Sequence, residues 1–402
     1  VKNLFVTRVE QHQIKRTNVL WQMCDDLCFK SKNLYNYANY IIRQEFVNNN
    51  KWIRYNSLDK MLKQEGVYKK LPAQTSQQIL KLLDKNWKSF FKAIKDWSKN
   101  KDKYLGKPKL PKYKKKNGRN VVIFTNQQCK IKDGYIKFPK TDLKLKTKVT
   151  EGLQQVRIVP KGSIYIIEVV YKKEIPDIIR ESNRVVGIDL GLDNFVTMVN
   201  NIGETPIVIN GKGIKSINQY YNKQLSYFKS ILKKQNGLDW SKRLEKLTLK
   251  RNNKMKDFMH KASRYVVNWC VHHNIDTIVI GKNDNWKQEI NLRKRLNQSF
   301  VQIPYDMFIK QLQYKCEEVG IKIVLTDESY TSGTSFLDGE APTKENYDKS
   351  RRIKRGLFRS NKGILINADV NGAYQIIKKV SPNAFADGVE GVGLHPVKLN
   401  VA

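Results

Sequence analysis

A carboxylate interrupts the most apolar strand pattern in the chain. The segment from Arg184 to Asn200, RVVGIDLGLDNFVTMVN, has the pattern of a buried strand that turns back into a second strand. Asp189 lies within the first of these strands. A charged carboxylate in such a strand is costly unless a partner, a set of hydrogen bonds or a metal ion stabilises it. The fold must therefore bring such a group to Asp189.

The pattern that follows this segment predicts an RNase H-like α/β domain over residues 183–402. Three strands come first, then long helices, two further strands with a helix between them, and a closing helix, which is the order of that fold. The expected strands are residues 185–191, 195–200, 206–210, 276–281 (DTIVIG) and 321–329 (IKIVLTDES). The expected helices lie between about 214 and 274, at 304–319 and at 367–379 (NADVNGAYQIIKK).

The first 182 residues predict a small β-barrel with an inserted helical bundle. Residues 1–16 alternate like a strand, and residues 120–174 contain short strands with turns at Asp133-Gly134 and Lys161-Gly162. Between them run two apolar stripes at helical spacing. The stripes consist of Leu34, Tyr37, Ile41 and Phe46, and of Ile79, Leu82, Leu83, Phe90, Phe91 and Ile94. The whole chain is thus predicted to be a multidomain α+β protein.

The chain is strongly basic. It holds 75 Lys and Arg against 37 Asp and Glu, a net charge of +38. Self-repulsion of this size favours a polyanionic partner, nucleic acid first and an anionic membrane surface second. The densest run, residues 99–119, holds nine Lys and one Arg against one Asp, with Tyr104 and Tyr113 interleaved. This pattern favours contact with nucleic acid over a solvated linker.

Other features of the composition concern compartment and cofactors. We expect no membrane association, because no apolar run is long enough to span a bilayer and no signal peptide opens the sequence. Five scattered cysteines favour a reduced, cytoplasmic protein. Cys24 and Cys28 have helical spacing, but they lack the further ligands that a tetrahedral zinc site needs.

Asp369 is the second candidate carboxylate. It follows an apolar run and opens a helix, where the positive end of the helix dipole favours an acid, although it could simply cap that helix. Mg²⁺ takes hard oxygen ligands. Two such ions about 4 Å apart can stabilise the attacking and leaving oxygens of a phosphodiester. Asp189 and Asp369 are therefore candidates for one two-ion Mg²⁺ site.

Several segments resemble the TnpB family, which comprises transposon-encoded RNA-guided nucleases related to type V CRISPR effectors. GIDLGLDNFVTMV and ILINADVNGAYQI are similar to its first and third RuvC motifs, and DFMHKASRYVVNWC, GKPKLPKYKKK and SYTS…SFLDGE support the likeness. The resemblance implies a wedge barrel, a helical recognition domain and a RuvC nuclease domain. The implied ranges are 1–16 for the first barrel strand, 17–100 for the recognition domain, 101–182 for the basic linker and the rest of the barrel, and 183–402 for RuvC, with a target-nucleic-acid-binding insert at 329–364.

The sequence departs from the family pattern in two places. Most members carry the middle glutamate where this chain has Gly281. We expect Glu328 to replace it as the third metal ligand, because its strand should neighbour that of Gly281; Asp327 is the alternative, and both could be loop acids. The second departure is the absence of the CxxC pairs of a zinc ribbon, so no zinc is expected. Arg351, Arg352 and Arg355 in this region are predicted phosphate contacts.

The resemblance implies an RNA-guided, Mg²⁺-dependent DNA endonuclease that cuts beside a short adjacent motif. Its partners would be a guide RNA from the transposon end and double-stranded target DNA, bound by one protein molecule. Gln74 and Gln78 are candidates for motif recognition because amides suit adenine edges, although both could simply face solvent. The candidate backbone contacts are Lys112, Lys114, Lys115 and Lys116. The alternatives are a nuclease-inactive guided repressor, a transposase proper, and a generic RNase H or junction resolvase.

Overall fold

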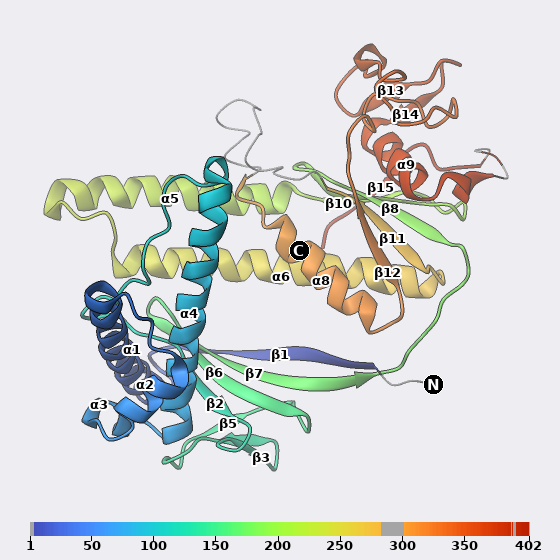
Figure 1. Cartoon of the computed structure of the whole chain (residues 1–402). Coiled ribbons are helices and arrows are strands. Elements are labelled where there is room, and N and C mark those ends of the chain that lie inside the picture. Colours follow the sequence, from blue (N-terminus) through green and yellow to red (C-terminus); the bar gives the residue numbers. More distant parts are fainter. Residues whose placement is uncertain (1–3, 283–300, 387, 389–390, 402) are drawn as a thin grey trace. The chain divides into compact units, whose positions relative to one another are not determined.

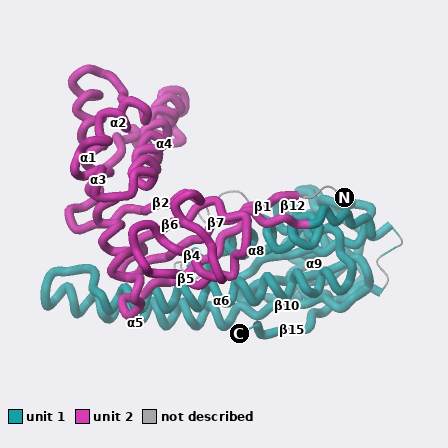
Figure 2. Tube along the Cα trace, turned by 90° about the horizontal axis from the view of Figure 1, so that it is seen from below, with its two compact units in different colours: residues 1–2, 176–402 teal, residues 3–175 magenta. Residues whose placement is uncertain are grey.

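The computed structural model describes residues 4–282, 301–386, 388 and 391–401. The chain divides into two compact units, residues 3–175 and residues 176–402 with residues 1–2 (Figure 2). The predicted first strand is observed from Leu4, and residues 1–3 lie outside the described part. A mixed α/β protein with more than one domain was expected, and this is what the structure has.

The strands of the N-terminal unit form two antiparallel sheets. The first sheet has the order β1-β7-β6-β2 and the second β3-β4-β5. Their bounds are β1 (Leu4–Ile14), β2 (Val122–Thr125), β3 (Lys130–Lys132), β4 (Tyr135–Lys137), β5 (Lys144–Lys146), β6 (Leu153–Lys161) and β7 (Ile164–Ile175). The predicted turn at Asp133-Gly134 joins β3 to β4, and both of its residues have positive φ, 52° and 74°.

The two sheets enclose one apolar core, to which Phe124, Ile136 and Ile167 contribute. Within the described residues, however, the seven strands are not closed into the single hydrogen-bonded barrel that the sequence suggested. The strands of the second sheet are only three residues long, and their ladder pairs them with one another. Packing of side chains therefore joins the sheets where a continuous ladder was expected.

The expected helices lie between β1 and β2: α1 (Trp21–Asn49), α2 (Tyr55–Leu62), α3 (Gly66–Lys69) and α4 (Ala73–Lys99) (Figure 1). Leu34, Ala38 and Ile42 of α1 share a core with residues of α4. The prediction that Tyr37 belongs to the buried stripe was wrong: it is 39% exposed, whereas Tyr35 is buried. The helical repeat carries the buried stripe through position 35, so residue 37 lies outside it.

The C-terminal unit contains a six-stranded sheet of order β12-β11-β8-β9-β10-β15. β9 is antiparallel to β8 and β10, whereas β11 is parallel to both β8 and β12. The bounds are β8 (Val185–Leu190), β9 (Asn194–Asn200), β10 (Ile207–Asn210), β11 (Thr277–Gly281), β12 (Lys322–Thr326) and β15 (Val397–Leu399). The edge strand β15, three residues long, was not predicted from the sequence.

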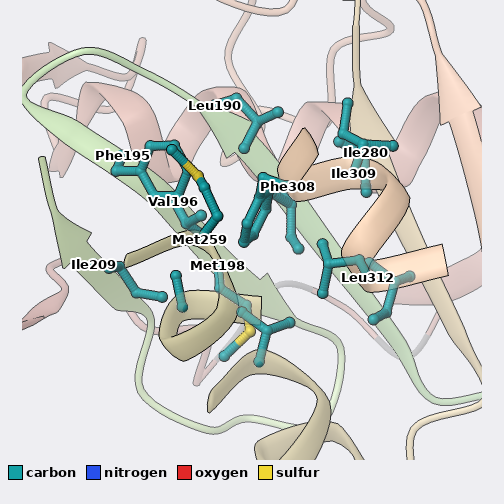
Figure 3. Packing of buried hydrophobic residues seen from close by; sticks show 14 of the residues in the cluster. Leu190, Phe195, Val196, Met198, Ile209, Met259, Ile280, Phe308, Ile309 and Leu312 are labelled. Carbon is teal, nitrogen blue, oxygen red and sulfur yellow. The ribbon is translucent and has the colours of Figure 1, made fainter. Parts of the chain in front are cut away.

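Helices cover this sheet on both faces. On one face Leu190, Phe195 and Ile280 pack in a core with residues of α6 and α8, such as Met259 and Phe308 (Figure 3). On the other face α9 forms a second core with Val185, Val199 and Val279. The helices are α5 (Lys212–Asn236), α6 (Lys242–His272), α8 (Tyr305–Glu317) and α9 (Ala368–Val380). The segment between β12 and α9 adds a hairpin of β13 (Leu357–Arg359) and β14 (Leu365–Asn367).

The alternation along β8 decides where Asp189 lies. Successive side chains of a strand point to opposite faces, so Val185, Gly187 and Asp189 share the face that α9 covers. A Cβ on Gly187 would lie 2.5 Å from the carbonyl oxygen of Ala373. Glycine is therefore required where α9 approaches the strand, and the close approach places this helix directly beside the Asp189 carboxylate.

All five cysteines are buried as free thiols. Burial raises the pKa of the Cys24 thiol to about 12, and a neighbouring carboxylate, Asp25, adds to the effect.

Among the described helices, none is both long and apolar enough to cross a membrane.

Candidate functional site

Asp189 lies one residue before the end of β8, under α9. It keeps some solvent access, but protein atoms surround it on most sides. Burial raises its pKa well above the usual range, and the negative charges of Glu328 and Asp369 raise it further, while Arg352 acts in the opposite direction. The other two carboxylates predicted from the sequence are therefore near enough to Asp189 for their charges to affect its pKa.

Gly372 of α9 lies beside this carboxylate. A Cβ at residue 372 would lie 3.4 Å from Oδ2 of Asp189, so a larger side chain would extend into the space around the acid. The carboxylate thus lies directly against the helix surface, one turn after Asp369.

Glu328 lies two residues after the end of β12, beside Gly281 at the end of β11. A Cβ on residue 281 would lie 2.5 Å from Cγ and 2.7 Å from Oε1 of Glu328. The Glu328 side chain therefore occupies the space that any side chain at position 281 would need. Burial raises the pKa of Glu328 to about 7; the charge of Asp327 also raises it, and Lys379 opposes the rise.

Asp327 has a different environment. Its carboxylate accepts hydrogen bonds from Lys379 Nζ at 3.2 Å and from the Ser329 amide at 3.1 Å, and its side chain is 57% exposed. Burial acts to raise the pKa of Asp327, but these hydrogen bonds outweigh it and bring the pKa below the usual value. Lys379 is ten residues beyond Asp369 on α9, about 15 Å along the helix at 1.5 Å per residue. Of the two adjacent acids, Glu328 is thus the one directed toward Asp189.

Asp369 is the second residue of α9, but it does not cap the helix. Asn367 is the N-cap, and its side-chain oxygen accepts hydrogen bonds from the amides of Asp369 and Val370. The carboxylate of Asp369 instead accepts a hydrogen bond from Asn194 Nδ2 at 2.7 Å and lies 3.8 Å from Arg352 Nη2. The capping alternative is therefore wrong, and Asp369 is directed into the site.

The three carboxylates are spread along one side of α9. Asp369 belongs to the helix, and Asp189 lies beside Gly372 of the helix. Glu328 lies near Ile376 of the helix, because an added Cβ at Gly281 would meet both side chains. These three helix positions span about two turns, or roughly 10 Å. Within the described residues, no three acidic, His or Cys side chains converge tightly enough to form a metal-binding group. Mutual repulsion favours this spacing, and Asn194 and Arg352 hold Asp369.

The donor chemistry nevertheless suits a divalent cation. All three groups offer hard carboxylate oxygens, which Mg²⁺ prefers. Burial, and after it the charges of Glu328 and Asp369, raise the pKa of Asp189, and a bound cation would stabilise its ionised form.

Basic and acidic residues surround the three carboxylates. Asp193, which was not predicted from the sequence, pairs with Lys215 Nζ at 2.5 Å and with Arg355. Arg352 lies beside Asp369, whereas Arg351 donates from Nη1 to both Glu340 oxygens at 2.7 Å. Two of the three predicted phosphate contacts thus adjoin the site, and Arg351 holds the insert together.

Asn194 and Asn367 were also not predicted from the sequence as residues of the site. The run INADV, with an Asn ahead of an acid at the start of a helix, is a recognisable N-cap signal. Asn194 has no such signal, because its contact with Asp369 joins segments 175 residues apart.

The N-terminal unit holds the remaining predicted residues. Gln74, near the start of α4, donates to Gln127 Oε1 at 2.8 Å and accepts from Thr125 Oγ1, and Gln78 is half-buried one turn later. The predicted backbone contacts lie in residues 107–116, here termed the strap, which crosses α1 without regular secondary structure. The four strap lysines, all exposed, are Lys112, Lys114, Lys115 and Lys116.

The strand order, the closing helix and the carboxylates define an RNase H-like domain with an acidic site, joined to a basic α/β unit. Residues 168–287 match the OrfB_IS605 family, described as "Probable transposase", and residues 305–376 match a family described as "Cas12f1-like, TNB domain". These two matches, in this order, show a likeness to the TnpB family over part of the C-terminal unit and support the resemblance seen in the sequence.

The comparison with solved structures found two complexes. The first is described as "Cryo-EM structure of the Cas12f1-sgRNA-target DNA complex"; it is 14% identical, with a TM-score of 0.51 over 89% of this chain and 82% of the other. The second, "Cryo-EM structure of CRISPR-Cas12f Ternary Complex", is 14% identical, with a TM-score of 0.38 over 88% and 80%. No curated protein matched the chain.

Proposed function

We propose that this protein is an RNA-guided, divalent-metal-dependent DNA endonuclease. The observation that carries the proposal is the grouping of Asp189, Glu328 and Asp369 beside α9 in a chain of net charge +38. A basic protein that concentrates negative charge at one point has a place for metal ions within a surface suited to nucleic acid. The family and the fold of the Cas12f1 complex agree with this reading.

Asp189, Glu328 and Asp369 would hold the metal. When bound, divalent ions supply charge stabilisation for the attacking and leaving oxygens of a phosphodiester. Asn194 orients the Asp369 carboxylate through its amide hydrogen bond. Asn367 serves the helix amides and so leaves that carboxylate available. Gly281 leaves the space in which Glu328 lies.

The arginines beside the site would position the substrate strand. Arg352, 3.8 Å from Asp369, and Arg355, paired with Asp193, can exchange these carboxylates for phosphate oxygens. In the N-terminal unit the four strap lysines would contact the nucleic-acid backbone, and Gln74 and Gln78 would contact the motif beside the target.

The partners proposed for this chain are a guide RNA from the transposon end and double-stranded target DNA. The similar solved complex, by its description, contains a single guide RNA and target DNA. In such proteins base pairing reads the sequence, and the protein holds the heteroduplex by its backbone. A guide would also give the basic N-terminal unit a role that a generic RNase H or resolvase leaves unexplained.

A guided DNA-binding protein without cleavage is the second candidate. One observation favours it: within the described residues the carboxylates do not form a compact metal-binding group. The two candidates differ in one measurable respect, because only the nuclease needs all three acids.

The test is plasmid cleavage by the protein co-purified with transcripts of its own locus. Asp189→Asn, Glu328→Gln and Asp369→Asn should each bind guide and target but lose cleavage by several orders of magnitude, because each removes a ligand that stabilises transferring charge. Asp327→Asn is the matched control and should keep most activity. Guided binding without cleavage by the unmodified protein would support the second candidate. Full activity of Glu328→Gln would contradict the proposed site.

A further inference from the structure

The N-terminal unit contains a pocket of about 500 Å³ beside the strap. α1 and α4 form its helical walls, and the strap closes the third side. Its volume lies within the usual range for pockets that hold a small organic ligand, about 300–1,000 Å³. The proposed nuclease chemistry makes no use of it.

Flat apolar surfaces line the pocket. Tyr113 of the strap and Phe90 of α4 contribute aromatic rings, and Pro108 and Pro111 contribute rigid apolar contact. The Tyr113 side chain is 44% exposed. The Arg43 guanidinium carbon lies 4.9 Å from the centre of its ring and fixes the ring by a cation–π contact. A planar ligand can therefore stack on a ring that is already held in place.

The polar groups of the pocket are of two kinds. Asn86 and Ser89 present an amide and a hydroxyl from α4, and the Asn86 amide donates to the Tyr35 hydroxyl at 3.1 Å. Lys109, Lys112 and Lys114 bring positive charge, and no acid is found among the described residues that line the pocket. Such a set suits a ligand with a flat hydrogen-bonding part and a negative part.

The strap is held in place by contacts that do not involve a ligand. Asn39 Nδ2 and Arg43 Nη1 donate to the Pro111 carbonyl at 3.0 and 3.1 Å. Asn36 bonds both the amide and the carbonyl of Lys114, at 2.8 and 2.9 Å. A preformed pocket avoids part of the ordering cost of binding. The dense positive charge of the strap is thus held in a definite shape.

We propose that this pocket binds one unpaired nucleotide of single-stranded nucleic acid. The base would stack on Tyr113 and Phe90, with Asn86 and Ser89 at its edge and the lysines at its phosphate. This inference rests on the proposed function, which supplies the nucleic acid, and adds a site that recognises an unstacked base. Bases in a duplex are stacked on their neighbours and cannot enter.

The experiment measures equilibrium binding of the full chain to two probes in EDTA, which excludes cleavage. The probes are single-stranded oligouridine and a fully paired RNA duplex of equal length, and oligothymidine in a third arm distinguishes DNA from RNA. Tyr113→Ala should weaken single-strand binding about tenfold, as expected for loss of one stacking contact, and leave duplex binding unchanged. Tyr113→Phe should keep the single-strand affinity of the unmodified protein, because it retains the ring. Tyr37→Ala, which removes an exposed tyrosine of α1 outside the pocket, should have no effect on either affinity.

A second variant removes the pocket and keeps Tyr113. Ala93→Phe places a ring among the lining residues and should lower single-strand affinity to a similar degree. Equal loss for single strand and duplex in either variant, or no loss in both, would overturn the proposal. Cleavage by the locus complex, assayed separately, reports on the nuclease proposal alone, so failures of the two proposals can be distinguished.

Discussion

Gly281 and Glu328 should be energetically coupled. An added Cβ at position 281 meets Glu328 Cγ at 2.5 Å, Ile376 Cδ1 at 2.6 Å and Glu328 Oε1 at 2.7 Å. All three distances are far below van der Waals contact, so Gly281→Ala must displace the Glu328 side chain, the Ile376 side chain or both. Overpacking of this kind costs about 1–3 kcal/mol.

The coupling follows from the two neighbours. In a Glu328→Ala background two of these three nearest contacts disappear, and that with Ile376 remains. Gly281→Ala should then cost less, with an interaction energy of about 0.5–3 kcal/mol between residues in direct contact. For a unit of this size about 1 kcal/mol corresponds to roughly 2–4 °C in Tm.

The assay is differential scanning calorimetry of the four proteins of this double-mutant cycle, in metal-free buffer. Gly281→Ala should lower the Tm in the unmodified background and lower it less in Glu328→Ala. Gly213→Ala is the matched control, because nothing lies within 4 Å of its added Cβ, and it should leave the Tm unchanged or slightly higher. An equal Tm loss in both backgrounds would refute the placement of Glu328 over Gly281.

Three further outcomes are expected. The folded-state pKa of Glu328, about 7 against an ordinary 4.5, means that the folded protein binds more protons than the unfolded chain between these values. Glu328 should therefore lower stability by up to about 3 kcal/mol as the pH rises through this window, and Glu328→Gln should reduce the fall in metal-free thermal melts and leave the part that Asp189 contributes. Replacement of the four strap lysines by alanine should reduce the slope of log affinity against log salt by about 3, measured by RNA binding, and an unchanged slope would contradict their role. Alanine at Gln74 and Gln78 together should flatten the adjacent-motif preference in a randomised plasmid-depletion assay; an unaltered preference would show that these amides do not read the motif.

Much of the C-terminal unit could be predicted from the sequence because periodicity encodes which face of an element is buried. The alternation along 185–190 places Asp189 on the face opposite Leu190, whatever covers that face. The order of strands and helices then restricts the sheet to few topologies, and the observed pairing of β11 with β12 agrees with the expectation. Residues 364–376 likewise combine an apolar run with a helix start, which marked Asp369.

Tertiary packing decided what periodicity could not. Whether Glu328 or Asp327 reaches Asp189 depends on the empty space at Gly281 and on Lys379, which lies 52 residues beyond Asp327. Both acids follow the end of β12, where the strand alternation no longer dictates direction. In the same way, Asp369 does not cap the helix because the Asn367 side chain lies where it can accept the hydrogen bonds of the first helix amides.

The N-terminal unit shows the same division. Composition alone identified the strap as basic and aromatic, and this suffices to predict affinity for a polyanion, because charge acts at long range. Its definite path comes from side chains of α1 that bind its backbone carbonyls, contacts between residues 68 to 84 positions apart. The exposure of Tyr37 and the pairing of strands into two sheets were decided by packing as well. The sequence by itself determined the local periods, the buried faces and the charge; only the folded chain decided which distant groups fill the same space, because short-range patterns contain no distances between separate elements.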